Sequence, residues 1–269
     1  MKWRNSFAVV AGCAVVGLTA SNAHAQSAFA GFYGQLSTGY ESNQLGSQTD
    51  TLTVTPYAKS DTNNTGPSQT FGGAPLVLGI GYYWQAADKW LIGVGADYSA
   101  LSQTSSTYPL TATNASGSTS IGSSESVTLN GGSMQLSNRF NLFITPGYAI
   151  DKDKLVYVKA GYSQVTAQYN RATSVTRANN GVSTTTVATG GNLSTNQGGY
   201  LLGLGYKQMF ASGLYGFVEG NYMGYSAPSY TFSSSNGLDT SRGVTTRAVT
   251  INFASLNTYQ MLIGLGYAF

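Results

Sequence analysis

The feature that most constrains this sequence is a two-residue alternation between large apolar side chains and small or polar ones. Near its end, Tyr259, Met261, Ile263, Leu265, Tyr267 and Phe269 alternate with Gln260, Leu262, Gly264, Gly266 and Ala268. Successive side chains of a β-strand point to opposite faces, so a period of two predicts a strand with one large apolar face. The same pattern recurs over 76–84 and 90–99.

Eight such segments follow one another, and the lengths of their connectors alternate as well. The segments cover about 30–41, 75–84, 89–101, 134–150, 154–168, 198–209, 214–226 and 257–269. Each is about as long as the 9–11 residues that a tilted strand needs to cross a bilayer, or somewhat longer. Three connectors are short (85–88, 151–153 and 211–213) and four are long (42–74, 102–133, 169–197 and 227–256). Short periplasmic turns alternating with long outer loops are typical of outer-membrane barrels.

We therefore predict an all-β fold: an eight-stranded antiparallel up-and-down transmembrane β-barrel with extended extracellular hairpin loops. The alternative is a soluble β-sandwich, whose strands also alternate. A sandwich would turn charged residues to water on the face opposite its core. Here that face holds mainly Gly, Ser, Gln and Ala, which suits the narrow interior of a small barrel.

The few charged residues within the strands provide a check on this assignment. An Arg or Lys facing lipid at the bilayer midplane costs about 2–4 kcal/mol, so strand charges should face the interior. The alternation places Asp97, Arg139 and Lys207 there and favours the same side for Lys159, whereas Glu219 is assigned inward by the rule itself. We expect these five to form a lumen charge network, with Lys207 and Glu219 able to pair diagonally. The network could be structural, or it could gate a small conductance.

Two further expectations concern the ends of the strands. Aromatic residues predicted at the rims are typical of the membrane–water interfaces: Trp84, Trp90, Tyr148, Phe210, Tyr267 and Phe269 at the short-turn end, and Tyr40, Tyr98, Tyr222 and Tyr259 at the other. Pro146 cannot donate to a ladder, and a closed barrel has no edge to hold it, so we expect a bulge there.

The long connectors are rich in Ser, Thr and Asn, but they also contain Thr- and Val-rich stretches that flank turn signals. These signals are Asn-rich or Gly-containing and lie at 63–66, 114–117, 179–181 and 235–237. The composition permits mobile loops. The flanking stretches favour hairpins that continue the barrel strands beyond the membrane.

The N-terminus has the pattern of a secretory signal peptide, so we expect a signal peptide at 1–25 and a barrel domain at 26–269. Lys2 and Arg4 precede an apolar run, and Ala23-His24-Ala25 is a small-x-small cleavage site, with cleavage expected after Ala25. A lipoprotein box ending at Cys13 is the alternative. Because the only cysteine and the only histidine lie in this segment, its removal leaves no thiol and no imidazole.

Several of these features resemble a known family. The signal peptide, the opening AFAGFYGQLSTGYES, the eight-strand layout and the terminal GLGYAF resemble the small outer-membrane β-barrels of the Gram-negative cell envelope, namely the OmpA-like and OmpX-like barrels and the porin-family barrel domains. The resemblance implies that the last strand carries the signal read by the outer-membrane assembly machinery, on Tyr259, Met261, Ile263, Leu265, Tyr267 and Phe269. Implied partners are outer-membrane lipid and lipopolysaccharide, the assembly machinery and an unidentified extracellular ligand. We expect no nucleic-acid partner.

Enzymes exist among such barrels, but we expect no catalytic activity here. The enzymatic barrels use a histidine, and the mature chain would have none. Lys159 and Ser163 could be imagined as a nucleophilic pair, although an interior charge is the simpler interpretation of Lys159. No cofactor or metal site is expected. Two roles remain: a structural or surface-interaction protein that displays four extracellular loops, or a porin-like channel for small solutes with a lumen gated by interior charges.

Overall fold

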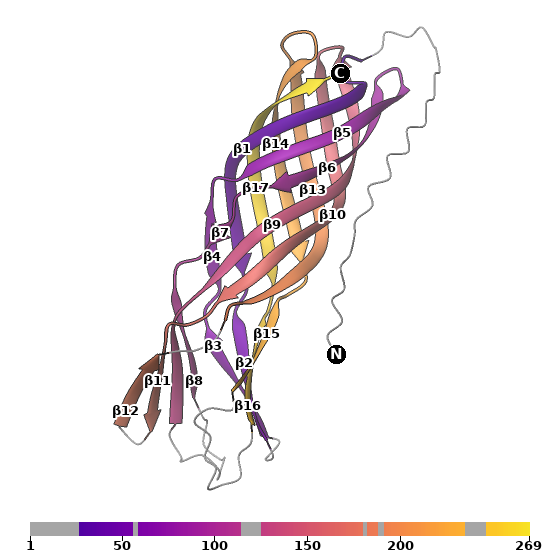
Figure 1. Ribbon diagram of the computed structural model, residues 1–269. Helices are drawn as coiled ribbons and strands as arrows, with labels where there is room; N and C mark the ends of the chain where they lie inside the picture. Colours follow the sequence, from indigo (N-terminus) through magenta and orange to yellow (C-terminus); the bar gives the residue numbers. More distant parts are fainter. Residues whose placement is uncertain (1–26, 56–58, 114–124, 180–181, 188–190, 235–245) are drawn as a thin grey trace, which may run out of the picture.

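The computed structural model describes residues 27–55, 59–113, 125–179, 182–187, 191–234 and 246–269. Its main body is a closed ring of antiparallel strands (Figure 1). In ring order these are β1 (Gly31–Leu45), β5 (Leu76–Ala87), β6 (Trp90–Ser99), β9 (Glu125–Asp151), β10 (Lys154–Asn170), β13 (Leu193–Met209), β14 (Leu214–Tyr225) and β17 (Leu256–Ala268). Each strand pairs with the next, and β17 pairs with β1. The predicted eight-stranded up-and-down barrel is therefore confirmed.

The last strand closes the barrel against the first. Its register with β1 runs without interruption from Tyr33 opposite Ala268 to Leu45 opposite Leu256. Beyond the ladder, the amide of Phe269 donates a hydrogen bond of 2.8 Å to the carbonyl of Phe32. This closure leaves no free edge in the wall for another chain to pair with.

The two faces of the wall differ as the alternation predicts. Large apolar side chains are exposed on the outside of every strand of the ring; they include Phe32, Leu36, Leu78, Ile80, Ile92, Val94, Leu142, Ile144, Val158, Leu202, Leu204, Val218, Met261, Ile263 and Leu265. Soluble monomers rarely expose continuous apolar surface of this extent. Among the described residues, no helix is long and apolar enough to cross a membrane.

Glycines on the inner face make room for large rings on the neighbouring strands. A Cβ atom on Gly266 would lie 2.2 Å from Cζ of Tyr215, and one on Gly205 would lie 2.3 Å from Cζ of Tyr157. Real Cβ atoms do not approach other atoms so closely. The narrow interior is therefore filled by tyrosines lying against glycine backbone.

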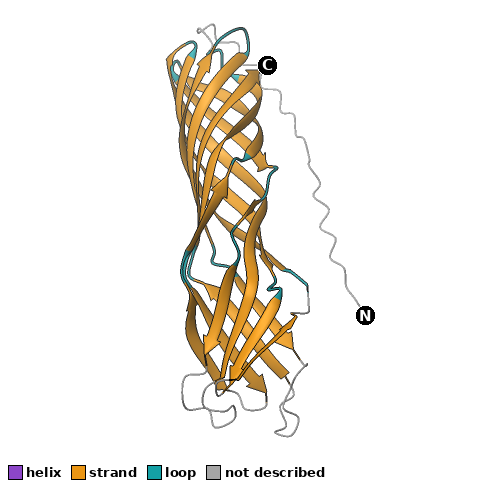
Figure 2. Cartoon of the chain, turned by 90° about the vertical axis from the view of Figure 1, so that its left-hand side faces the viewer, coloured by secondary structure: helices purple, strands orange, loops and turns teal. Residues whose placement is uncertain are grey.

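Beyond the barrel, the hairpins form two further sheets at the end opposite the C-terminus (Figure 2). One has the order β15 (Ser229–Ser234), β16 (Thr246–Phe253), β2 (Gln48–Thr55) and β3 (Lys59–Gly66). The other joins β8 (Tyr108–Thr113), the first part of β9, β11 (Ser174–Asn179) and β12 (Val182–Val187). Two short strands, β4 (Gln69–Gly73) and β7 (Gln103–Thr104), pair with β1 and β9 at the junction. We call this region the extension, and it confirms the predicted hairpins.

The position of the first predicted turn is wrong. Residues 63–66 belong to β3, which pairs with β2 so that the chain reverses between Thr55 and Lys59. The polar Asn and Thr residues there satisfy their backbone in a ladder rather than in a turn. The signals at 114–117, 180–181 and 235–237 lie outside the described residues. In each case the two strands on either side of the signal pair with each other: β8 with β9, β11 with β12, and β15 with β16.

The bulge expected at Pro146 is also wrong. Pro146 lies opposite Ile92 in regular register with β6, and β9 keeps one register with β10 on both sides of it. The missing donor is accommodated by two missing pairs in the β9–β10 ladder rather than by an extra residue. The register shifts fall instead between Ala149 and Asp151 and between Ser137 and Phe140.

The second shift centres on Asn138, which has a φ of 51°. Asparagine tolerates this left-handed conformation better than most residues. Because the bulge adds one residue to β9, even-numbered Leu136 and odd-numbered Arg139 both face inward, at 2% and 3% exposure. The barrel wall and the extension therefore use opposite parities of the same strand.

Candidate functional site: the barrel interior

In the described part of the chain, the interior of the barrel contains six buried charged residues, three acidic and three basic. The structure places all five of the residues assigned inward from the sequence there, namely Asp97, Arg139, Lys159, Lys207 and Glu219. The sixth, Glu41, closes the predicted first strand, and it was missed although its odd parity matches the inward Tyr33 and Ser37. Equal numbers of the two signs give the described interior no formal net charge.

Arg139 organises the end of the interior nearest the extension. Its guanidinium pairs with the carboxylate of Glu41 and donates to Asn43 Oδ1 and Thr258 Oγ1, each at 3.2 Å. Its Nε donates to the hydroxyl of Tyr225 at 2.9 Å. These contacts tie β9 to β1, β14 and β17 across the lumen. A guanidinium with this many partners satisfies the donors that burial would otherwise leave unpaired.

Lys159 lies farther from the extension than this cluster and bridges two carboxylates. Its ammonium is 2.8 Å from Asp97 Oδ2 and 2.9 Å from Glu219 Oε1, and all three side chains are at most 4% exposed. Asp97 also accepts from Asn141 Nδ2 at 2.5 Å. Glu219 also accepts from the Tyr157 hydroxyl at 2.7 Å and from Asn221 Nδ2 at 2.8 Å. The triad links β6, β10 and β14.

Lys207 does not make the expected pair with Glu219, whose carboxylate is occupied by Lys159. Among the described residues no carboxylate lies within ion-pair distance of Lys207, and its one hydrogen bond reaches Gln35 Oε1 at 3.3 Å. Aromatic rings surround it instead, with the ammonium 4.2–5.9 Å from the ring centroids of Tyr33, Tyr83, Tyr157, Tyr215 and Phe217. Rings attract a cation through their negative faces, which partly replaces a counter-ion.

Sequence reasoning missed this aromatic cage, because it expected a small and polar inner face. The sequence did contain a signal for the cage. The alternation places four tyrosines on the same face as the interior charges of their own or adjacent strands: Tyr33, Tyr83, Tyr157 and Tyr215. The glycines opposite them were the second signal.

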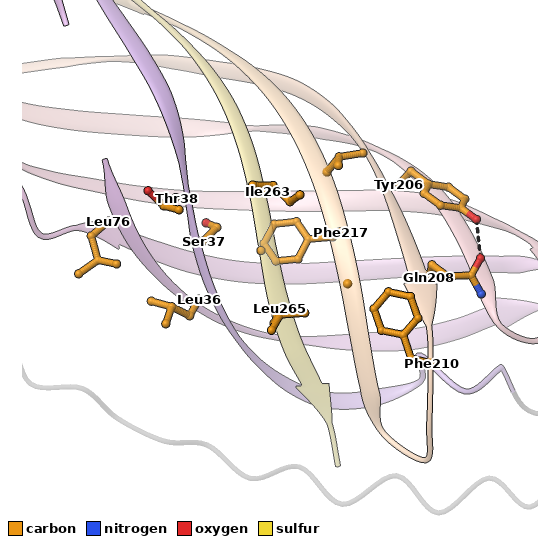
Figure 3. A pocket seen from close by; sticks show the side chains of 13 residues that line it. Leu36, Ser37, Thr38, Leu76, Tyr206, Gln208, Phe210, Phe217, Ile263 and Leu265 are labelled. Atoms are coloured by element: carbon orange, nitrogen blue, oxygen red, sulfur yellow. Dashed lines mark hydrogen bonds between the residues drawn. The ribbon is translucent and has the colours of Figure 1, made fainter. Parts of the chain in front are cut away.

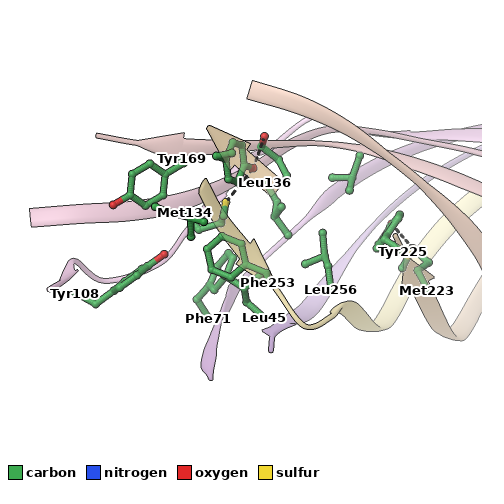
Figure 4. Close-up of a cluster of buried hydrophobic side chains, with 14 of the residues drawn as sticks. Leu45, Phe71, Tyr108, Met134, Leu136, Tyr169, Met223, Tyr225, Phe253 and Leu256 are labelled. Atoms are coloured by element: carbon green, nitrogen blue, oxygen red, sulfur yellow. Dashed lines mark hydrogen bonds between the residues drawn. The ribbon is translucent and has the colours of Figure 1, made fainter. Parts of the chain in front are cut away.

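Apolar clusters lie at both ends of this polar interior. At the short-turn end, Phe29, Leu91, Leu155, Met209 and Ala268 pack with the aromatic cage. At the junction with the extension, a second cluster includes Leu45, Phe71, Tyr108, Met134, Leu136, Tyr169, Phe253 and Leu256 (Figure 4). Several of these side chains have no exposure to solvent. The ionised groups are thus enclosed between two apolar layers.

Phe29 belongs to the segment that precedes β1 and turns into the mouth of the barrel. The amide of Ser27 donates to Gln85 Oε1 at 3.0 Å, and the ring of Phe29 lies edge-on to Tyr215 with centroids 5.9 Å apart. At 2% exposure, Phe29 helps to fill the short-turn mouth.

The outer wall carries an open groove of about 580 Å³ (Figure 3). Its lining comes mainly from outward residues of β1, β13, β14 and β17, including Leu36, Phe210, Val218, Ile263 and Leu265. At one end Tyr206 donates to Gln208 Oε1 at 2.7 Å. The groove lies in the exposed apolar outer face of the ring, which we call the apolar belt.

The imagined nucleophilic pair is not assembled. Ser163 shares a hydrogen bond of 2.7 Å with the Tyr225 hydroxyl, whereas Lys159 is held by Asp97 and Glu219. Within the described part of the chain, no group of three or more His, Cys, Asp or Glu residues could hold a metal ion.

The residues of the last strand assigned to the assembly signal all point outward. Tyr259, Met261, Ile263, Leu265, Tyr267 and Phe269 are between 46% and 81% exposed, and Phe269 packs edge-on against Tyr267 with ring centroids 5.1 Å apart. Other rings gather at the predicted rims, such as Trp90 against Tyr148 at one end and Tyr222 against Tyr259 at the other.

No family model matches the chain, and no curated protein matches it. Among solved structures, it is similar to the outer membrane protein OprG from Pseudomonas aeruginosa (15% identity, TM-score 0.45, covering 89% of this chain and 96% of that one). The outer membrane protease OmpT from Escherichia coli is another (11%, 0.42, 91% and 98%), and so is Ail, the attachment invasion locus protein of Yersinia pestis, in complex with the heparin analogue sucrose octasulfate (11%, 0.34, 89% and 99%). The barrel assignment rests on the strand pairing of this chain itself.

Proposed function

We propose that this chain is an integral protein of the Gram-negative outer membrane, exported by the N-terminal signal peptide. Its barrel spans the bilayer, and its extension stands outside the cell. The exposed apolar belt supports this proposal, because soluble proteins rarely expose so much apolar surface and membrane barrels carry an outward apolar band of this kind. Aromatic residues at both ends of the belt would lie at the two interfaces.

We further propose a structural or surface-interaction role without a catalytic step. The single observation that carries this role is the enclosed interior: apolar clusters lie at both ends of a charge network with equal numbers of acidic and basic residues. A conducting pore needs a continuous polar path, and eight strands leave an interior that side chains can fill. The competing role, a porin-like channel gated by the interior charges, would need such a path to run through the apolar clusters.

The proposed partners follow from the surfaces of the molecule. Lipid and lipopolysaccharide would contact the apolar belt, and the assembly machinery would read the outward residues of β17 during insertion. The hairpins of the extension would then be available to an extracellular ligand.

Orientation can be tested with single cysteines, because the mature chain would contain none of its own. Thr231→Cys places a thiol on the exposed face of β15, and Ser212→Cys places one in the short turn between β13 and β14. A membrane-impermeant maleimide should label Thr231→Cys on intact cells and should label Ser212→Cys only after the outer membrane is disrupted. Labelling of Ser212→Cys alone on intact cells would refute the orientation.

Conduction can be tested with purified protein in planar bilayers. We expect no steady openings from the wild type. Steady openings that change in size with Arg139→Ala or Glu219→Gln would contradict the structural role and support the channel.

A further inference from the structure

The extension has four sheet edges, and three of them carry a feature that discourages another strand from pairing. β3 contains Lys59 and Asp61 and lies close to β8. β8 contains Pro109, where its register with β9 shifts. β15 is tied to the barrel because the Tyr230 hydroxyl donates to the carbonyl of Ala167 at 2.9 Å. Charges, prolines, bulges and coverage are the usual ways in which proteins protect sheet edges.

The fourth edge, β12, has none of these features. Its sequence VSTTTV contains no charge, proline or glycine, and its register with β11 is unbroken. Ser183 to Val187 are all exposed, Val187 at 81%. Figure 1 shows β12 at the margin of the extension, and no described strand pairs with its second side. Short uncharged segments of high β propensity are those that add strands most readily.

The sequence of β12 is also nearly the same when reversed, with Ser and Thr exchanged at one pair of positions. In an antiparallel pair of two copies centred between Thr184 and Thr185, Val182 lies opposite Val187, Ser183 opposite Thr186 and Thr184 opposite Thr185. Threonine and serine pairs stabilise neighbouring strands through hydroxyl contacts, and no like charges meet. A hydroxyl contact of this type already exists within the sheet, between Thr176 and Thr185 at 3.0 Å.

We propose that β12 pairs with β12 of a second copy of this chain. The inference rests on the proposed function, since it requires the extension to be displayed outside the cell. An antiparallel pair of identical strands has a two-fold axis, so each copy presents the same edge to the other.

The direction of the strands determines where the second copy lies. β9 runs from the extension into the barrel, β11 is antiparallel to β9, and β12 is antiparallel to β11, so β12 runs toward its own membrane. The β12 strand of an antiparallel partner must run the other way. Its barrel therefore lies in a second, facing membrane, and the contact bridges two cells or two vesicles rather than two neighbours in one bilayer.

A single contact of six residues is small compared with stable protein interfaces, so one pair would be weak. Many copies on two facing surfaces would act together, because each contact raises the effective concentration of the next. The expected result is clustering of membranes that depends steeply on the density of the protein.

The test uses charge exchange at the two central positions of β12. T184K/T185K places lysine opposite lysine in a pair of identical copies, T184E/T185E places glutamate opposite glutamate, and a mixed pair places opposite charges together. Each variant of the mature chain is reconstituted into phosphatidylcholine vesicles, and clustering is followed by turbidity. We expect wild-type vesicles to cluster and each variant alone to cluster at least about tenfold less, because like charges facing each other oppose association. Mixing the two variant populations should restore clustering.

A matched control places the same charges on another exposed strand of the extension. S229K/T231K on β15 should leave clustering unchanged. Each preparation is also labelled at Thr231→Cys, or for the β15 variant at Ser106→Cys, an exposed position between β7 and β8, to verify that the extension is displayed. Absence of restored clustering in the mixture, or loss of clustering in S229K/T231K alone, would overturn the proposal. If the extension is displayed and wild-type vesicles do not cluster, the β12 pairing fails while the proposed function stands.

Discussion

Replacement of Lys159 by methionine should destabilise the barrel more than any other single change among its interior charges. Methionine keeps most of the length of the side chain, so the main loss is the ammonium group that bridges Asp97 and Glu219. Removing one partner of a buried ion pair typically costs about 3–5 kcal/mol, because the remaining charge is left without compensation. Here two carboxylates are left, and the interior gains a net negative charge.

The remaining contacts predict which second change should rescue this variant. Without Lys159, Glu219 still accepts from Tyr157 and Asn221, whereas Asp97 keeps one donor among the described residues, Asn141. Asp97 is therefore the less satisfied carboxylate. K159M/D97N restores electrical balance and removes the worse-placed charge, so it should recover about 2 kcal/mol, and K159M/E219Q should recover less.

Urea titration of the protein in lipid vesicles, followed by tryptophan fluorescence, measures both effects. With a slope of about 2 kcal/mol per molar urea, a loss of about 4 kcal/mol lowers the unfolding midpoint by roughly 2 M. Val158→Ala, on the outward side of the same strand, is a control for general damage to β10. A K159M midpoint within about 0.5 M of the wild type, at an unchanged slope near 2 kcal/mol per molar, would refute the reasoning. A double variant no more stable than K159M would do so as well.

Three other outcomes are expected. Lys207→Met should lower the free energy of unfolding by about 1–2 kcal/mol in the same titration, less than Lys159→Met does, because rings rather than carboxylates hold the Lys207 ammonium. An equal or larger loss of stability would mean that the Lys207 charge matters more to the barrel than the Lys159 charge. Deletion of Phe269 should lower the amount assembled in the outer membrane far more than it lowers the urea midpoint of the protein once folded, and normal outer-membrane levels would count against an assembly signal there. Burial raises the pKa of Tyr230, so its contribution to stability is complete below the ordinary tyrosine value of about 10 and is lost as the pH rises above it. Proteolysis of the extension should therefore accelerate above about pH 10 in the wild type and less in Tyr230→Phe, and identical pH profiles would exclude Tyr230 as the cause.

The alternation of side chains was sufficient to predict the barrel, because each face of the wall has a single requirement. Lipid excludes charge, so the position of Arg139 or Lys159 within its strand determines its side. The individual partners could not be predicted in the same way. Glu219 is near Lys207 across the β13–β14 hairpin, but its carboxylate pairs with Lys159 of β10 instead. Which of two lysines pairs with a carboxylate depends on how the side chains cross the closed lumen.

Local backbone features were predicted less well. Pro146 was expected to force an extra residue, but its missing donor only interrupts the ladder on one side. The bulge occurs at Asn138, where no proline or glycine marks it. Asparagine is common in turns and bulges alike, so its presence alone does not separate the two.

Because of the bulge at Asn138, the inward residues of β9 are even-numbered before the bulge and odd-numbered after it. Upstream of it, the strand leads through the junction to the extension, and downstream it belongs to the barrel wall. A change of one residue upstream would normally turn every later side chain over, which would place Arg139 on the outer face of the wall. A bulge that can be gained or lost absorbs such a change. The displayed hairpins can thus vary in length, even by odd numbers, while the wall keeps its inner and outer faces.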